Sequence, residues 1–583
     1  MDKSMERSND KLTTVQTSKI KTQLELTNIL WTVPLVLLII FYFYPLLAIL
    51  EKSLSNIKSA HDIVEIISKP YVIKTLWFTI WQATLSTILT LIIGLPGAYI
   101  FSHYNFFGKH FLRVLTTIPF VLPTVVVAAS FEAILGTNGL LNTLLINYLN
   151  LGFSPIVLKH NLWSILIAHV FYNTTIILRL VGDHWQTIDP KIAQASYMLG
   201  ANKLKSFSKI TLPILTPSII SATLLTFIFN FTSFGVILIL GGPTFSTIEV
   251  AIYRQTINFF DLNLAAILSI IQLFCTLFLT IAYTLISYRS TTMFKKNKLP
   301  IVSNKKVNWH NKILIFIISM LLVICLVSPL LSLAIKSIFT GQIHNEVLQH
   351  MRPSYTLNYY KELFINRRQS VLFTSPLETM IFSIRNAIIT TIITLTIGIP
   401  TTWVLTRKST LKKIVEPLLM LPLGTSSVTL GLGFLLVFSK PPLNLRTSTM
   451  ILPLAHTLIA FPFVIRSLLP VWSQINPQIR QAASMLGANN LIVWFRIELP
   501  IIARSILVAG IFAFTISLGE FGATILLSRP EFTTIPMAIY RYLSLPGELN
   551  YGQAMALSTI LMCVSGLSIF CIETIRPNTI SEF

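Results

Sequence analysis

One stretch of the sequence occurs twice, as Ile188-Asp-Pro-Lys-Ile-Ala-Gln-Ala-Ser-Tyr-Met-Leu-Gly-Ala-Asn202 and again as Ile475-Asn-Pro-Gln-Ile-Arg-Gln-Ala-Ala-Ser-Met-Leu-Gly-Ala-Asn489. A Leu-Pro pair follows each copy, Leu212-Pro213 and Leu499-Pro500. The register is constant, because the matched prolines are separated by the same distance as the matched glycines (500 − 213 = 487 − 200 = 287). A repeat of this length indicates two copies of one structural unit in a single chain.

The similarity between the two halves extends well beyond these stretches. At the same offset His169 matches His456, and Trp185 matches Trp472. One gap-free block therefore covers the last three apolar runs of each half. Further upstream, Gly94-Leu-Pro96 matches Gly398-Ile-Pro400 at a different offset (398 − 94 = 304), so an insertion or deletion lies between.

The composition is that of a membrane protein. Hydrophobic residues make up 53% of the 583 residues and charged residues 11%, whereas a soluble domain has about 25% charged residues. The 44 Lys and Arg against 22 Asp and Glu give a formal net charge of +22. We attribute this excess to cytoplasmic loops, where basic residues of membrane proteins collect, and not to nucleic-acid binding.

Twelve apolar runs are long enough to cross a bilayer. Basic residues follow every second run, which predicts that both termini and both repeat stretches face the cytoplasm. With six spans in each half, the halves enter the membrane in the same orientation and are parallel repeats. The predicted spans are 29–50, 73–101, 113–135, 160–182, 214–240, 263–288, 313–337, 379–405, 414–438, 448–470, 501–527 and 552–575.

The predicted fold is therefore an all-α polytopic membrane protein of about 12 transmembrane helices in two parallel six-helix repeats. We expect a cytoplasmic N-terminal tail (1–28), a first transmembrane domain (29–288), a cytoplasmic linker (289–312) and a second transmembrane domain (313–583). The first apolar run lacks a small-residue cleavage site, so we interpret it as a retained span. The four cysteines lie in apolar stretches and predict no disulfide framework.

Each repeat stretch has the pattern of a short amphipathic helix, a glycine and a second helical segment. Pro190 suits the first position of a helix, and Ile192, Ala195 and Leu199 recur on one face. Gly200, like its counterpart in the second copy, allows a turn with positive φ or a close approach of another chain.

These residues resemble the EAA loop of binding-protein-dependent ABC importer permeases, in the fused two-domain group that takes up iron(III) or thiamine. The resemblance implies type I ABC importer transmembrane domains and coupling helices that dock on a separate ATPase subunit. The motif's glutamate is replaced by glutamine in both copies, which puts a salt bridge to the ATPase in doubt but not docking by shape. The implied coupling residues are Gln194, Ala195, Gly200, Ala201, Leu212, Pro213, Gln481, Ala482, Gly487, Ala488, Leu499 and Pro500.

Polar residues in the fifth span of each half are the candidates for a translocation pathway, since the resemblance implies that this span lines it. Ionisable side chains within spans are costly and call for a functional hypothesis. The alternative is a carboxylate that reaches the outer interface or pairs with a neighbour. His169 and His456 are interpreted as hydrogen-bonding neighbouring helices. The pathway candidates are Asn230, Thr232, Ser233, Glu520 and Gly522.

Several chemistries are not predicted. The chain has no Gly-x-x-x-x-Gly-Lys-Ser/Thr loop, no metal-ligand cluster and no paired carboxylates suited to acid-base catalysis. We therefore predict no enzyme activity, no catalytic or metal-binding residues and no cofactor. ATP hydrolysis would come from an ABC ATPase dimer, with an extracytoplasmic solute-binding protein delivering the solute.

The sequence thus predicts the permease of an ABC importer in a bacterial cell membrane, multi-pass, with both termini cytoplasmic and the lipid bilayer as its surroundings. Overall resemblance slightly favours iron(III) as the solute, with thiamine as the alternative. A secondary transporter is the rival class, but it would need ion-coupling carboxylates at the membrane midplane. A purely structural or enzyme-anchoring membrane protein would not explain the paired loops.

Overall fold

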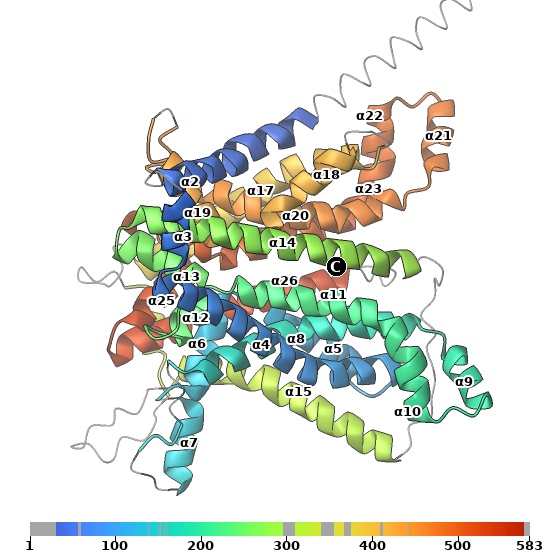
Figure 1. Cartoon of the computed structure of the whole chain (residues 1–583), viewed down its shortest axis with the longest axis horizontal. Helices are drawn as coiled ribbons and strands as arrows, with labels where there is room; N and C mark the ends of the chain where they lie inside the picture. Colours follow the sequence, from blue (N-terminus) through green and yellow to red (C-terminus); the bar gives the residue numbers. More distant parts are fainter. Residues whose placement is uncertain are drawn as a thin grey trace, which may run out of the picture.

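The computed structural model describes residues 31–55, 60–137, 139–149, 151, 153–156, 158, 160–294, 309–339, 355–365, 375–407, 412–441 and 443–575. All of the predicted N-terminal tail (1–28) and residues 295–308 of the predicted linker lie outside these ranges. Among the described residues the only extended pairing is an isolated bridge between Phe339 and Tyr355. The rest of the ordered structure is helical, and the long helices run roughly side by side (Figure 1).

The first half begins with a helix over Trp31–Leu54, which includes a π-helical turn at Ile39–Phe43 and ends as α2 (Tyr44–Leu54). Its other helices are α3 (Ala60–Ile67), α4 (Pro70–His103), α5 (Lys109–Val121), α6 (Thr124–Leu135), α7 (Leu140–Leu149), α8 (Leu162–Thr187), α9 (Pro190–Met198), α10 (Lys203–Ser206), α11 (Leu212–Phe231), α12 (Gly235–Leu240), α13 (Ile248–Tyr253) and α14 (Leu262–Phe294).

The second half repeats this order except for α7, so that α17 corresponds to α4 and α26 to α14. Its helices are α15 (Trp309–Lys336), α16 (Asn358–Glu362), α17 (Pro376–Leu405), α18 (Lys412–Met420), α19 (Ser427–Val437), α20 (Ile451–Ser473), α21 (Pro477–Met485), α22 (Asn490–Val493), α23 (Leu499–Gly519), α24 (Gly522–Leu527), α25 (Ile535–Ser544) and α26 (Glu548–Ile575).

The predicted fold class is confirmed. The described chain has 11 helices long and apolar enough to cross a membrane, or up to 12 if a bent pair counts as one span. In that pair, Val415–Gly424 and Ser427–Val437 meet at 99°.

Four of the predicted spans are not continuous helices. The run 113–135 is divided between α5 and α6 at Leu122-Pro123, and the run 414–438 is the bent pair. The runs 214–240 and 501–527 break at Thr232–Phe234 and at Glu520. Proline explains the first break, because Pro123 has no N–H and its backbone is extended.

The two halves are interlocked through their first helices. Tyr42 and Leu38 belong to the same buried core as Phe434 and Phe438 of the second half. Conversely α15, the first helix of the second half, packs against α6, α5 and α4 of the first. Each half therefore completes its core with a helix from the other.

Small residues allow the closest helix crossings, and they do so at matching positions. A Cβ added to Gly94 of α4 would lie 2.7 Å from the Cβ of Ile177 on α8. In the second half a Cβ on Gly398 of α17 would lie 2.9 Å from Val464 of α20. Both contacts are closer than side-chain carbons normally approach, so only glycine fits without a shift of the helices.

We therefore expect Gly398→Ala to destabilise the protein by about 1 to 3 kcal/mol, because the added methyl group overpacks the crossing. Adding Val464→Ala should recover most of the loss, as both changes act on one contact. The measurement is the thermal unfolding midpoint in detergent. Gly566→Ala is the matched control, since open space surrounds that helical glycine. Equal midpoints for Gly398→Ala and Gly566→Ala would contradict a tight crossing.

Candidate functional site

The first repeat stretch folds into a helix-turn-helix. The Asp189 side chain accepts a hydrogen bond from the N–H of Lys191 (2.9 Å) and caps the start of α9. At the other end the N–H of Gly200 bonds to the carbonyl of Tyr197 (3.0 Å), and that of Ala201 to Ser196 (3.0 Å). This pair of bonds is a Schellman motif, which ends a helix with a left-handed residue.

The second repeat stretch has the same geometry. Asn476 caps α21 through the N–H of Gln478 (3.0 Å), and the N–H of Ala488 bonds to the carbonyl of Ala483 (3.0 Å). The φ angles of Gly200 and Gly487 are 81° and 82°. The positive φ expected at both glycines is confirmed.

Both stretches present bare apolar tips. Met198 and Leu199 are 89% and 88% exposed, and Met485 and Leu486 are both 89% exposed. The two helix-turn-helix units lie at the same end of the helix bundle, on opposite sides of the bundle (Figure 1). We call this end of the bundle the loop end. Of the predicted coupling residues, those exposed are Gln194, Ala195, Gly200, Leu212, Pro213, Gln481, Ala482, Gly487 and Pro500, and those half-buried are Ala201, Ala488 and Leu499.

A cavity of about 250 Å³ lies between the two halves, where α11 and α23 break. Four of the five pathway candidates line it, namely Thr232, Ser233, Glu520 and Gly522. Asn230 is not among the lining residues, because its side chain is buried and bonded to Asn173 (2.7 Å) and Thr87 (3.2 Å).

Glu520 holds the break between α23 and α24 together. Its Oε1 accepts the N–H of Ala523 (3.0 Å), and its Oε2 accepts the N–H of Thr524 (3.1 Å). Nε2 of His456 lies 3.4 Å from Oε2. The carboxylate therefore both lines the cavity and replaces the missing backbone partners of α24.

The two paired histidines act as helix connectors. His169 hydrogen-bonds with Ser86 (3.1 Å) and Ser233 (2.8 Å). His456 hydrogen-bonds with Ser517 (2.9 Å) and with Thr524 (3.0 Å). The prediction that both histidines bond neighbouring helices is confirmed.

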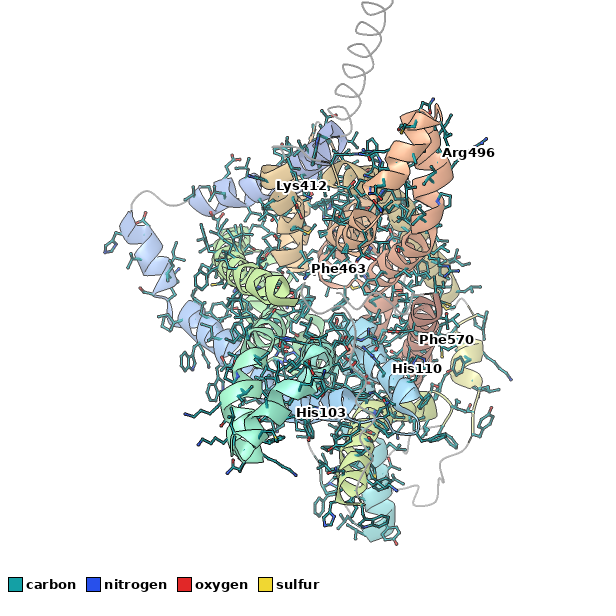
Figure 2. The ribbon with its side chains drawn as sticks, turned by 90° about the vertical axis from the view of Figure 1, so that its right-hand side faces the viewer. His103, His110, Lys412, Phe463, Arg496 and Phe570 are labelled. Carbon is teal, nitrogen blue, oxygen red and sulfur yellow. The ribbon has the colours of Figure 1, made fainter. Side chains whose placement is uncertain are left out.

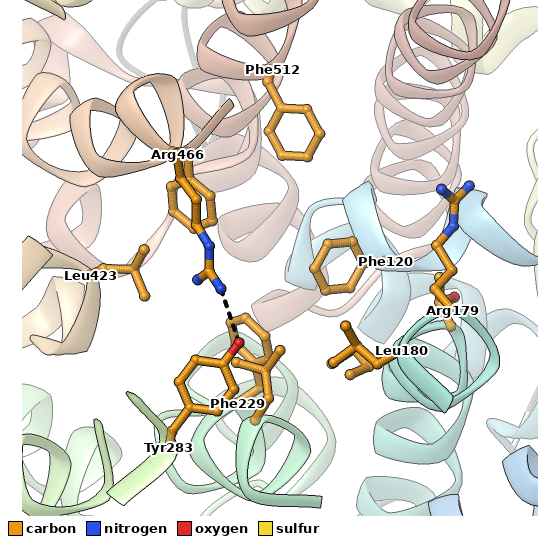
Figure 3. A pocket seen from close by; sticks show the side chains of 12 residues that line it. Phe120, Arg179, Leu180, Phe229, Tyr283, Leu423, Arg466 and Phe512 are labelled. Atoms are coloured by element: carbon orange, nitrogen blue, oxygen red, sulfur yellow. Dashed lines mark hydrogen bonds between the residues drawn. The ribbon is translucent and has the colours of Figure 1, made fainter. Parts of the chain in front are cut away.

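A second, smaller cavity of about 80 Å³ adjoins the first. The two cavities share four lining rings, contributed equally by the two halves: Phe120, Phe229, Phe463 and Phe512. Figure 3 shows this smaller cavity, and from the loop end Phe463 lies near the middle of the molecule (Figure 2).

Two matching arginines flank the smaller cavity with different partners. Arg179 forms an ion pair with Glu573 of α26. Arg466 instead donates a hydrogen bond to the Tyr283 hydroxyl (3.0 Å, dashed in Figure 3), with its guanidinium 5.8 Å from the centre of that ring.

Four aromatic residues, related in pairs by the repeat, pack together on the other side of the large cavity. Phe234 and Phe521 meet across the two halves with ring centres 5.5 Å apart. Tyr253 packs edge-on to Phe234 (5.7 Å), and Tyr540 packs against Phe521 (5.5 Å). We call this group the aromatic seal. Its short helices lie at the end of the bundle opposite the loop end, the far end (Figure 1).

The comparisons with known proteins agree with this architecture. The family model described as "binding-protein-dependent transport system inner membrane component" matches residues 91–292. The thiamine transport system permease protein of Haemophilus influenzae is 27% identical over 514 residues, covering 86% of this chain and 88% of its own. The ferric transport system permease protein of Actinobacillus pleuropneumoniae is 25% identical, covering 93% of this chain and 78% of its own.

The chain thus contains a matching inner-membrane-component segment and is similar over most of its length to permeases of binding-protein-dependent ABC importers. Its match to two full-length permeases over most of their length is consistent with two fused transmembrane domains. A solved structure, described as a bacterial ABC transporter involved in the import of the acidic polysaccharide alginate, matches 49% of the permease and 99% of its own chain, at 16% identity and a TM-score of 0.38.

Sequence reasoning missed the four shared rings, and it did not predict that the aromatic residues of the seal pack against one another. A phenylalanine within an apolar span has no distinguishing pattern, so Phe120 or Phe463 could not be told from lipid-facing residues. The seal left a partial trace, because the pairs Phe234/Phe521 and Tyr253/Tyr540 are preserved at the repeat offset (521 − 234 = 540 − 253 = 287).

Removing the seal should open the large cavity of the permease at its far end. We expect Phe234→Ala combined with Phe521→Ala to speed the labelling of a Thr232→Cys reporter by about tenfold, since each ring contact contributes about 1 kcal/mol. The measurement is labelling by a membrane-impermeant thiol reagent from the far side, with the four native cysteines replaced. Phe463→Ala, on the opposite side of the cavity, is the control and should leave the rate unchanged. Unchanged labelling in the double variant would show that other groups close this end.

Proposed function

We propose that this permease forms the membrane pathway of an ATP-driven importer for a small organic cation, with thiamine as the best candidate. An ATPase subunit docks on each helix-turn-helix, which places the loop end, the linker and both termini in the cytoplasm. A solute-binding protein delivers the solute at the far end.

The paired loops carry the docking part of the proposal. Five apolar side chains at the tips are at least 79% exposed, namely Met198, Leu199, Leu204, Met485 and Leu486. Exposed apolar tips are costly in water, and Met198, Leu199, Met485 and Leu486 lie outside the helices that are long and apolar enough to span a membrane. A protein partner that covers both tips at once removes that cost, and two equal tips fit an ATPase dimer.

The pathway follows from the two cavities. The solute enters the 250 Å³ cavity when the aromatic seal parts, and leaves past the four shared rings when the loop end opens. Burial raises the pKa of Tyr253, and neighbouring Tyr540 raises it further, so this phenol is neutral in the closed seal. The same helices therefore have two arrangements, one open at the seal and one open at the loop end. The free energy of ATPase docking at the loops favours one of them.

The lining of the large cavity favours thiamine over iron(III). Aromatic rings from both halves face it, and such rings attract an organic cation through their faces. Its one carboxylate, Glu520, is already occupied by two N–H groups and His456. Within the described residues no group of three or more His, Cys, Asp or Glu side chains is placed to hold a metal ion.

Substitution at the loop glycines tests docking. Gly200→Asp or Gly487→Asp forces a side chain into a left-handed turn, at about 1 to 2 kcal/mol, and adds a charge at the tip. We expect the ATPase to be lost from the purified complex in the double variant, and transport with it. Gly108→Asp is the matched control, because Gly108 has φ 80° and open surroundings outside the repeat loops.

If Gly200→Asp and Gly487→Asp, alone and combined, leave ATPase binding intact, the docking assignment is wrong. Transport that persists without any ATPase subunit would instead identify a secondary transporter.

Competition identifies the solute. In proteoliposomes with the ATPase and the cognate binding protein, unlabelled thiamine should abolish uptake of radiolabelled thiamine, whereas ferric citrate should not. Phe463→Ala should lower the maximal rate several-fold, as it removes a ring from the path, and leave ATPase binding unchanged. Uptake of radioactive iron with no uptake of thiamine would reverse the assignment.

A further inference from the structure

The second repeat loop is fixed to the membrane helices through one buried carboxylate. Glu498 ends the π-helical turn that precedes α23, and its side chain is 1% exposed. Its Oε2 accepts the indole N–H of Trp403 (3.0 Å) and of Trp472 (3.1 Å). Its Oε1 lies 2.5 Å from Nε of Arg480 on α21. One side chain thus ties the docking helix α21 to both α17 and α20.

Arg407, just beyond the end of α17, is a second cation at this site. Its guanidinium lies 4.0 Å from Oε1 of Glu498 and 4.7 Å from the centre of the Trp403 ring. Burial and the nearby Arg480 lower the pKa of Arg407, and Glu498 opposes that shift. We call Glu498 and its four partners the charged anchor.

A buried ion that loses one partner is left uncompensated, which is strongly unfavourable. Helix α21 therefore cannot tilt against α17 and α20 without breaking the Arg480 contact or pulling Glu498 away from both indoles. Any force applied to α21 moves these membrane helices with it.

The first repeat loop has no such anchor. At the positions of Glu498 and Arg480 it has Thr211 and Ala193 (498 − 211 = 480 − 193 = 287). Trp185 is retained, but it stacks on Phe207 with ring centres 6.0 Å apart.

Other contacts are found near α9, where Thr211 and Ala193 carry no charge. His103, which aligns with Arg407 (407 − 103 = 304), packs edge-on to Trp185 at 5.2 Å. A hydrogen bond between Ser196 and Ser206 (2.7 Å) joins α9 to α10. A hydrogen bond between two neutral hydroxyls can break and re-form at low cost.

We propose that the two docking loops are mechanically unequal: the charged anchor makes α21 a rigid extension of the second half, whereas α9, which has Thr211 and Ala193 in place of Glu498 and Arg480, can pivot. This inference rests on the proposed function, in which both helices dock on the ATPase. Closure of the ATPase dimer then drives the second half directly and the first half with a lag.

Hydrogen-deuterium exchange of the permease-ATPase complex tests the inequality. We expect the amides of 477–485 to exchange about tenfold more slowly than those of 190–198, because opening α21 must break the buried ion pair between Arg480 and Glu498. Glu498→Gln should remove the difference. Thr211→Val, the equivalent position in the first half, should leave both rates unchanged.

Two further variants separate a mechanical role from simple stability. Arg480→Gln combined with Glu498→Gln removes both charges and should keep the wild-type melting temperature, yet speed exchange in α21 and lower the thiamine delivered per ATP hydrolysed. Arg480→Lys with Glu498 intact keeps the cation. Exchange in α21 and the thiamine delivered per ATP should therefore be as in the wild type. Equal exchange of α9 and α21 in the wild type, or unchanged α21 exchange in Glu498→Gln, would overturn the proposal. If the docking assignment itself is wrong, the ATPase will still bind the permease that carries Gly200→Asp and Gly487→Asp.

Discussion

A helix that breaks inside a bilayer must find new partners for the backbone groups it frees, because the lipid offers none. The permease depends on this constraint at the centre of the molecule, where α23 ends and α24 begins. Glu520 meets it by accepting the N–H groups of Ala523 and Thr524. Because the break is satisfied locally, the chain can open a cavity at that depth without exposing bare amides.

The same break sets the packing around it. Gly522 begins α24 so close to Ser427 that a Cβ there would lie 2.2 Å from the hydroxyl oxygen. Gly235 of the first half faces Thr124 in the same way, at 2.5 Å. Gly522 thus packs against the first residue of α19, and Gly235 packs against the first residue of α6. Helices α19 and α6 each follow a break of their own. Cavity, seal and broken spans therefore form one connected arrangement.

Much of the architecture could be predicted from the sequence, because the length of an apolar run and the match between the two halves are each read from many residues. The helical fold, the two related halves and the positive φ of Gly200 and Gly487 are of this kind. The breaks at Leu122-Pro123 and Glu520 were not predicted, since a proline alone does not mark a break: Pro96 and Pro400 lie inside continuous helices. The charged anchor was also hidden: Glu498 and Trp403 are far apart in the chain, and only folding brings them together.

The exchange of first helices between the halves bears on how the protein is made. Helix α2 leaves the ribosome before α19, against which it packs, has been synthesised. At about 5 to 20 residues per second, roughly 20 to 80 seconds separate the two helices. During that interval the face of α2 destined for the second half is covered only by lipid or by the insertion machinery. The two halves consequently cannot mature one after the other, and the first remains incomplete until most of the chain has been translated.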